Sequence, residues 1–126
     1  MPSMVALKTK YMNSMETYQE ALHSVVQLKR GLAAAIRALF AREKANLMVE
    51  QLPVLLAIYH NPGRYLQEIA TLTYRDKSSV QRTVVNLSRK GYVQILDDRT
   101  DRRRKLLVPT RKGRELSEKI ALLTLE

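Results

Sequence analysis

The sequence contains no cysteine, so no disulfide can support the fold and no thiolate can ligate a metal. Histidine is almost as scarce, with only His23 and His60 in the chain. Neither has a metal-ligating or catalytic partner nearby in sequence, and the four scattered glycines form no phosphate-binding loop. We therefore expect no metal, no cofactor and no enzymatic activity.

Long apolar runs are also missing. No run approaches the roughly 18 residues needed to span a bilayer, and residues 1–20 lack the apolar centre of a secretory signal. These absences predict a cytoplasmic protein that does not associate with membranes.

Acidic residues are few, with 12 Asp and Glu against 22 Lys and Arg, for a formal charge of +10. A field of this sign attracts polyanions, and nucleic acid is the polyanion that basic folded domains most commonly bind. General solubility, a ribosomal partner and an anionic membrane are the alternatives. Aromatic residues make up only 6%, and no stacking platform for single-stranded RNA is visible.

The first third of the chain predicts a long helix. Residues 1–15 show little periodicity and are expected to be flexible, whereas residues 16–45 have apolar side chains at alternating spacings of three and four, interrupted by Lys29. About 28 helical residues would extend ~42 Å, which exceeds a compact domain. We therefore expect a dimerisation helix rather than an ordinary core helix. The predicted dimer contacts are Tyr18, Leu22, Val25, Leu32, Ile36 and Leu39.

Residues 49–108 predict a helix-turn-helix followed by a hairpin. Helices are expected at 49–60 and 65–72, and a further helix is expected to begin after the N-cap residue Asp76 and to run to Lys90 before Gly91.

The period then becomes extended. Strands are expected at 92–96 and 105–108, joined by a loop too charged to be buried, with a last helix at 111–124. The predicted fold is mainly α with a small β-hairpin (α+β), a winged helix-turn-helix within a single domain over residues 16–126.

One face of the helix after Asp76 suits a DNA major groove. Val80, Val84 and Leu87 have the spacing of a buried stripe, which leaves arginines and neutral hydrogen-bonding groups on the other side. Arginine can pair with guanine, and glutamine or asparagine with adenine. An ordinary solvated face is the alternative. The candidate contacts are Ser78, Ser79, Gln81, Arg82, Asn86 and Arg89.

The hairpin loop concentrates positive charge at a narrow tip, where an arginine can enter a minor groove. Asp101 could orient a neighbouring guanidinium by a charge-assisted hydrogen bond. A solvated charge run is the alternative. The candidate contacts in the wing are Arg99, Arg102, Arg103, Arg104 and Lys105.

The stretch from Leu66 to Gly113 resembles the winged helix-turn-helix of the MarR (multiple antibiotic resistance regulator) family. The resemblance rests on DKSSV at residues 76–80, on Asp101-Arg102-Arg103 in the loop, and on Thr110 with Lys112-Gly113 after it. It implies a homodimer on a palindromic double-stranded DNA site, with one recognition helix in each of two successive major grooves. It also implies that Arg102 is the wing-tip arginine, that Asp101 and Arg103 brace the wing, and that a small-molecule effector is a further partner to consider.

The chain departs from the family pattern at several points. Pro109 replaces an apolar strand residue, Val85 stands where an acidic residue is common, and the C-terminal helix region is shorter than usual. Dimerisation is therefore expected to depend more on the N-terminal helix. The expected function is that of a sequence-specific transcriptional regulator. The alternative is a winged-helix module that binds protein, or nucleic acid without operator specificity.

Overall fold

The computed structural model describes residues 3–125, and the chain divides into two compact units, residues 1–38 and 39–126. The boundary falls inside the first helix, between Ala38 and Leu39, so the single domain expected over residues 16–126 is replaced by two units.

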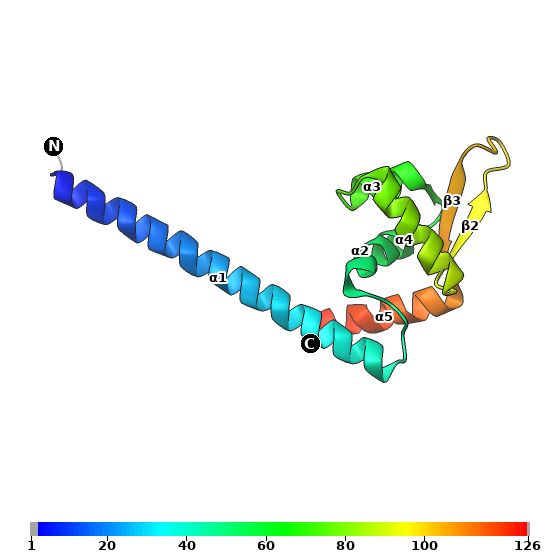
Figure 1. Cartoon of the computed structure of the whole chain (residues 1–126), viewed down its shortest axis with the longest axis horizontal. Helices are drawn as coiled ribbons and strands as arrows, with labels where there is room; N and C mark the ends of the chain where they lie inside the picture. The colour runs from blue at the N-terminus through cyan, green and yellow to red at the C-terminus, as the bar shows by residue number, and fades with distance from the viewer. Residues whose placement is uncertain (1–2, 126) are drawn as a thin grey trace. The chain divides into compact units, whose positions relative to one another are not determined.

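A single helix, α1 (Met4–Arg42), accounts for the whole described part of the first unit except Ser3 (Figure 1). It begins at Met4 rather than near Glu16, so the prediction of a flexible N-terminus is wrong for residues 4–15, while residues 1–2 lie outside the described chain. Local chemistry explains the early start. Ser3 Oγ accepts a hydrogen bond from Ala6 N at 3.1 Å, as a helix N-cap does. Residues 4–15 also contain good helix formers and no glycine or proline.

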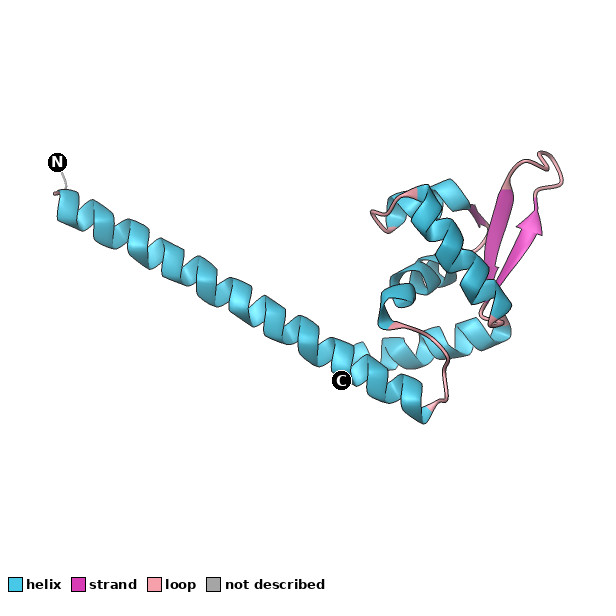
Figure 2. Cartoon of the chain, in the orientation of Figure 1, coloured by secondary structure: helices cyan, strands magenta, loops and turns pink. Residues whose placement is uncertain are grey.

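The second unit combines helices with a small sheet (Figure 2). After the last turn of α1 and a 3₁₀ turn at Val49–Gln51, its elements are α2 (Leu52–His60), β1 (Arg64–Tyr65), α3 (Leu66–Leu72), α4 (Lys77–Arg89), β2 (Val93–Asp97), β3 (Lys105–Pro109) and α5 (Arg111–Leu125). The mainly helical winged fold predicted from the sequence is confirmed.

The sheet has three antiparallel strands in the order β1-β3-β2, where the sequence predicted a two-stranded hairpin. The register pairs Val93 with Pro109 at one end of the hairpin and Asp97 with Lys105 at the other. Strand β1 has only two residues, too few to show a period of two, and it pairs Arg64 with Leu107. This strand ties the helix-turn-helix to the hairpin.

One apolar core fixes the positions of α4 and the hairpin. Val80, Val84 and Leu87 are each at most 2% exposed, as the predicted stripe requires. The other core side chains are Leu39, Phe40, Leu52, Val54, Leu55, Ile58, Ile69, Ala70, Tyr92, Val93, Leu107, Leu116 and Ile120.

Candidate nucleic-acid interface

The outer face of α4 is exposed and free of carboxylates. Asp76 caps the helix, its Oδ2 accepting a hydrogen bond from Ser79 N at 2.9 Å. This cap confirms the helix start that the sequence predicts. A shallow depression of about 460 Å³ runs along the face. It is lined by Ser78, Gln81, Arg82, Val85, Asn86 and Arg89.

Two predicted contacts of α4 are less accessible than the others. Asn86 is half-buried, and its Oδ1 accepts a hydrogen bond from Gln51 Nε2 at 2.8 Å. Ser79 is also half-buried. Because one end of the Asn86 amide already has a partner, only the other end remains for a ligand.

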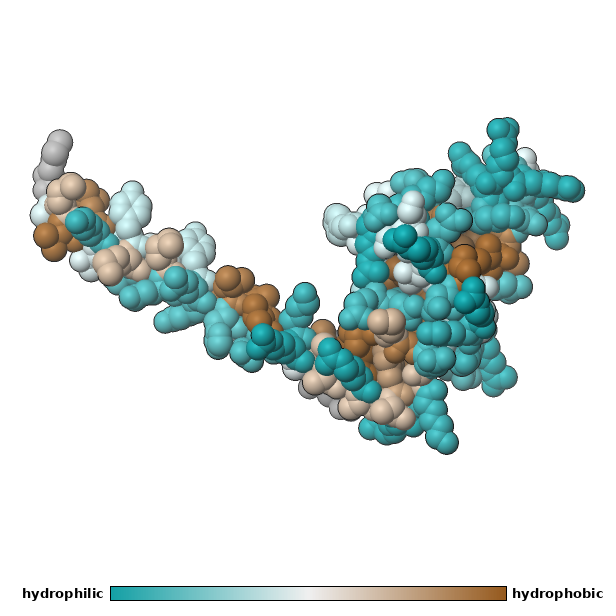
Figure 3. Space-filling model, viewed as in Figure 1, coloured by the Kyte–Doolittle hydropathy of each residue, from teal (hydrophilic) through white to brown (hydrophobic). Residues whose placement is uncertain are grey.

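The arginine-rich hairpin tip, residues 98–104, projects beyond the helices of the second unit, and Figure 3 shows hydrophilic side chains gathered there. Asp101 Oδ1 accepts a hydrogen bond from Arg103 N at 3.1 Å, and the Asp101 carboxylate lies within 3.8 Å of the Nε atoms of Arg103 and Arg104. Asp101 therefore contacts both arginines through one backbone hydrogen bond and two ion pairs. Its part in DNA binding stays a prediction.

The cations of the wing differ in how free they are. Lys105 pairs with Asp97, and this pairing lowers the pKa of the Asp97 carboxyl. Within the described chain, Arg99 and Arg102 form no hydrogen bond or salt bridge through their side chains, and both are exposed. Arg103 is exposed over 95% of its side chain despite its contact with Asp101. The least engaged charges therefore lie at the tip.

The base of the tip holds a cluster that the sequence did not reveal. Tyr65 Oη donates a hydrogen bond to Asp98 Oδ2 at 2.6 Å, while Thr100 donates to Asp98 Oδ1 from both N and Oγ1. The guanidinium of Arg104 lies 4.8 Å from the centre of the Tyr65 ring. Asp98 is only 8% exposed, so the expectation that this loop stays wholly unburied is wrong at this residue.

These contacts shift two ionisations. The hydrogen bond from Tyr65, helped by those from Thr100, lowers the pKa of Asp98 to about 2. The same hydrogen bond to Asp98 raises the pKa of Tyr65. Asp98 is therefore a carboxylate and Tyr65 a neutral phenol at neutral pH. No pattern of neighbouring residues could have indicated this pair, because 33 positions separate the two residues.

A cleft of about 820 Å³ joins the helix-turn-helix to the wing. Gln81 on α4 and Arg103, Arg104 and Lys105 on the wing line the same cleft, so predicted contacts from two separate segments converge. Lys77 adds a fourth positive charge, and Glu68 is the one carboxylate among the lining residues. The cleft is thus a cationic concave surface suited to a phosphate backbone.

The exposed side of α1 is a second surface. Four of the predicted dimer contacts are open, with Tyr18 at 75%, Leu22 at 65%, Val25 at 60% and Leu32 at 46% exposed. Ile36 and Leu39 are not available as predicted, because they are only 6% and 3% exposed and Leu39 belongs to the core of the second unit.

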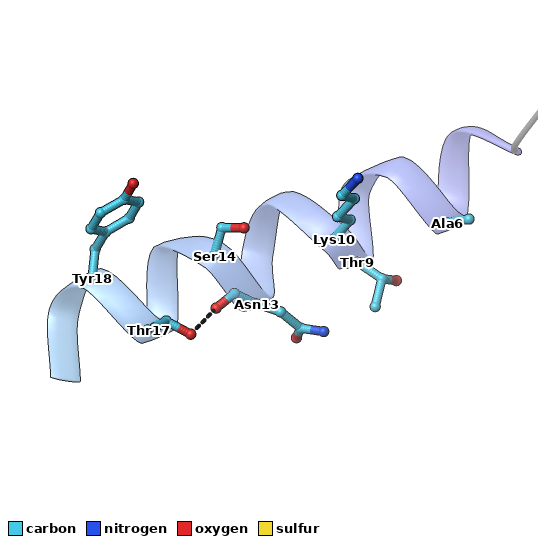
Figure 4. Close-up of a pocket in the computed structure, with 7 residues that line it drawn as sticks. All are labelled: Ala6, Thr9, Lys10, Asn13, Ser14, Thr17 and Tyr18. Atoms are coloured by element: carbon cyan, nitrogen blue, oxygen red, sulfur yellow. Dashed lines mark hydrogen bonds between the residues drawn. The ribbon is translucent and has the colours of Figure 1, made fainter. Parts of the chain in front are cut away.

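The apolar stripe also continues upstream of residue 16, where the predicted helix begins. Its added members, at spacings of three or four, are Met4, Leu7, Tyr11 and Met15. A hollow beside this part of the stripe is a groove between helix ridges rather than an enclosed pocket (Figure 4). It is lined by α1 alone, through Ala6, Thr9, Lys10, Asn13, Ser14, Thr17 and Tyr18. In it, Thr17 Oγ1 donates to Asn13 O at 2.9 Å.

Among residues 3–125, no helix combines the length and the apolar character of a membrane-spanning segment. In the same part of the chain, no three His, Asp or Glu side chains are grouped so that they could hold a metal ion.

Comparison with known proteins agrees with the fold. A family model described as "MarR family" matches residues 46–104. The uncharacterised HTH-type transcriptional regulator YybA of Bacillus subtilis is 32% identical over 62 residues. That match covers 49% of this chain and 41% of YybA, so the chain spans less than half the length of this curated relative.

Solved structures show the same arrangement. A MarR protein from Peptoclostridium difficile is 29% identical, with a TM-score of 0.69 over 82% of this chain and 67% of that one. Streptococcus pneumoniae FabT, solved in complex with DNA, superposes with a TM-score of 0.74 over 88% of this chain and 78% of its own, at 19% identity, a likeness of fold alone.

The helix-turn-helix, the three-stranded sheet and the projecting hairpin together define a winged helix-turn-helix protein. Over residues 46–104 the chain is similar to the MarR family.

Proposed function

We propose that this protein is a sequence-specific transcriptional regulator that binds double-stranded DNA, with α4 in the major groove and the arginine-rich tip in the adjacent minor groove. The observation that carries the proposal is the shared cleft, in which Gln81 of α4 faces the same space as Arg103 and Arg104 of the wing. One duplex lying across this cleft would contact both elements.

The outer face of α4 has the chemistry of base readout. Arg82 and Arg89 can each form two hydrogen bonds with a guanine, and Gln81 can pair with an adenine. Ser78, next to the helix N-terminus, is placed for a phosphate, which the helix dipole also favours. Val85 is 42% exposed and can contact a thymine methyl group.

The wing supplies the minor-groove half of the proposal. Arg102 lies in the tip, exposed and without a salt bridge among the described residues, so its guanidinium is free to insert. Arg99 and Arg103 would then approach the flanking phosphates.

The functional unit is proposed to be a homodimer formed through α1. A stripe of exposed apolar side chains at helical spacing gains stability only when a second surface covers it. A second copy supplies the same stripe, and two-fold symmetry would present one α4 to each half of a palindromic site. FabT, which has a similar fold, was solved in complex with DNA, and this supports the DNA-binding part of the proposal.

The rival function is a winged-helix module that binds an acidic protein. Binding to an acidic protein does not require that a helix face without carboxylates lie beside an arginine-rich tip. That combination favours DNA.

The test is a titration of duplex DNA at salt concentrations from about 50 to 200 mM. Neutralisation of about six to ten phosphates should weaken binding roughly 10³-fold or more over this range. On an operator selected from random duplexes, Arg82→Ala should weaken the binding free energy by about 1–3 kcal/mol. The difference in affinity between operator and scrambled DNA should also become smaller. Tight binding to acidic protein with little salt dependence would favour the rival, and an Arg82→Ala variant with full discrimination would remove Arg82 from base readout.

A further inference from the structure

We propose that Tyr65 is a positioning residue for DNA binding, which acts through Asp98 to fix the direction in which the arginine tip leaves the sheet. The inference rests on the proposed function and adds a residue outside both the recognition helix and the wing.

The contact joins two parts of the fold. Tyr65 ends β1 and is the N-cap residue of α3, so its backbone belongs to the helix-turn-helix. Its own position is held by Glu68, whose Oε1 accepts a hydrogen bond from Tyr65 N at 3.1 Å. Asp98 is the first residue after β2, where the hairpin leaves the sheet. The 2.6 Å hydrogen bond between them therefore links the helix-turn-helix to the base of the tip.

The tip has few other attachments. The strand register ends at the pair Asp97–Lys105, and the hydrogen bonds among residues 98–104 are local to the loop. Among the described residues, only Tyr65 reaches the tip from outside the hairpin by a hydrogen bond or ring contact, through Asp98 and through the guanidinium of Arg104. Without this contact, the tip would be oriented by the two strands alone.

The chemistry suits a permanent tether rather than a switch. Asp98 is largely buried and accepts three hydrogen bonds, from Tyr65 and twice from Thr100, and its pKa of about 2 keeps it charged at neutral pH. The buried carboxylate would be costly without these donors. The guanidinium of Arg104 over the phenol ring adds a second contact between Tyr65 and the tip.

The test substitution is Tyr65→Phe, which keeps the ring against Arg104 and removes only the hydroxyl. Affinity for duplex DNA should fall about tenfold, the scale of one lost hydrogen bond to a charged group. If one wing arginine loses its phosphate, the slope of log affinity against log salt should become shallower by about 0.9. Limited trypsin digestion, read by mass spectrometry, should cleave the tip several-fold faster in the variant without any DNA present.

Tyr59→Phe is the matched control. Tyr59 is half-buried in the same unit, and its hydroxyl forms no hydrogen bond with the described residues, so affinity, salt slope and tip cleavage should stay at wild-type values. Asp98→Asn should lie nearer to wild type than Asp98→Ala, since an amide can still hydrogen-bond to the Tyr65 hydroxyl.

Two results would overturn the inference. A Tyr65→Phe variant that melts earlier but keeps wild-type affinity and salt slope would give Tyr65 a purely structural role. Unchanged cleavage of the tip in Tyr65→Phe would show that the Tyr65 hydroxyl does not restrain the tip. Failure of the wild-type protein to bind any duplex is a separate result and would refute the proposed function, because the cleavage comparison does not depend on DNA.

Discussion

At the scale of single residues, Asp98 and Asn86 have roles that their neighbours in sequence do not indicate. Asp98 stands in a run of charged residues, yet it is buried beneath Tyr65. Asn86 lies on the outer face of α4, yet Gln51, 35 positions earlier, bonds to its amide. Both side chains are set by a distant partner, and each partner positions a candidate DNA-binding segment.

The depressed pKa of Asp98 predicts a loss of stability in acid. The folded-state pKa of Asp98, about 2, lies below the reference value of 3.8. The contribution of Asp98 to the free energy of unfolding is therefore fully present above about pH 4 and is lost as the pH falls through about 2. Urea unfolding at several pH values between 5 and 2 should show the wild-type midpoint falling more steeply than that of Asp98→Asn. Parallel curves for the two proteins would mean that Asp98 does not couple folding to protonation.

At the scale of elements, the junction of α4, β2 and α5 explains why a glycine is needed at position 113. A β-carbon on Gly113 would lie 2.1 Å from the carbonyl oxygen of Tyr92, which is far inside the contact distance of two non-bonded heavy atoms. Thr110 Oγ1 donates to Gly91 O at 2.6 Å, and Lys112 Nζ donates to Lys90 O at 3.0 Å across the same junction. Thr110, Lys112 and Gly113, which form a pattern in the sequence, therefore hold the start of α5 against the segment between α4 and β2.

Gly113→Ala should destabilise the second unit by about 2 kcal/mol, within the range for overpacking, because the clash is with backbone and not with a flexible side chain. The measurement is the urea midpoint at neutral pH. Glu118→Ala, on an exposed position of the same helix, is the control and should change stability by no more than about 0.5 kcal/mol. Equal midpoints for Gly113→Ala and wild type would show that α5 can shift away at little cost.

At the scale of the whole molecule, the arginine-rich tip and the apolar stripe of α1 lie on different units of the chain. The arginine tip and the outer face of α4 belong to the second unit, whereas the apolar stripe from Met4 to Leu32 belongs to the first (Figure 3). Under the proposed function, one unit would bind a second copy while the other binds DNA. The two activities should then be separable by mutation.

Leu22→Asp should convert a dimer into a monomer, because it places a charge at the centre of the apolar stripe, where Leu22 is 65% exposed. Light scattering coupled to size-exclusion chromatography should show the mass falling toward the 14.5 kDa of one chain. Binding to a two-half-site operator should weaken in parallel.

Gln27→Asp is the control, because Gln27 is exposed and lies away from the stripe on the same helix. It should leave the dimer intact. A wild-type protein that is monomeric at all concentrations, or a Leu22→Asp dimer as stable as wild type, would show that α1 is not the dimer contact.

Much of the fold and of the candidate site was predictable because it depends on residues close together in sequence. The stripe of Val80, Val84 and Leu87 and the Asp76 cap are settled within one or two helical turns. The hairpin and its charged tip follow from alternation and composition over residues 92–108. The start of α1 also has local signals, because Ser3 can cap the helix and Met4, Leu7, Tyr11 and Met15 continue the spacing of three and four.

The sequence by itself determined the helices, the face of α4 that turns outward and the concentration of arginine in the wing. Only the tertiary structure decided that β1 adds a third strand, that Ile36 and Leu39 are buried, and that Tyr65 and Asp98 meet. The physical reason is the sequence separation of the interacting residues. Helix caps and apolar stripes depend on neighbours a few residues apart, whereas burial of a side chain and pairing across a sheet depend on which distant segments the core brings together.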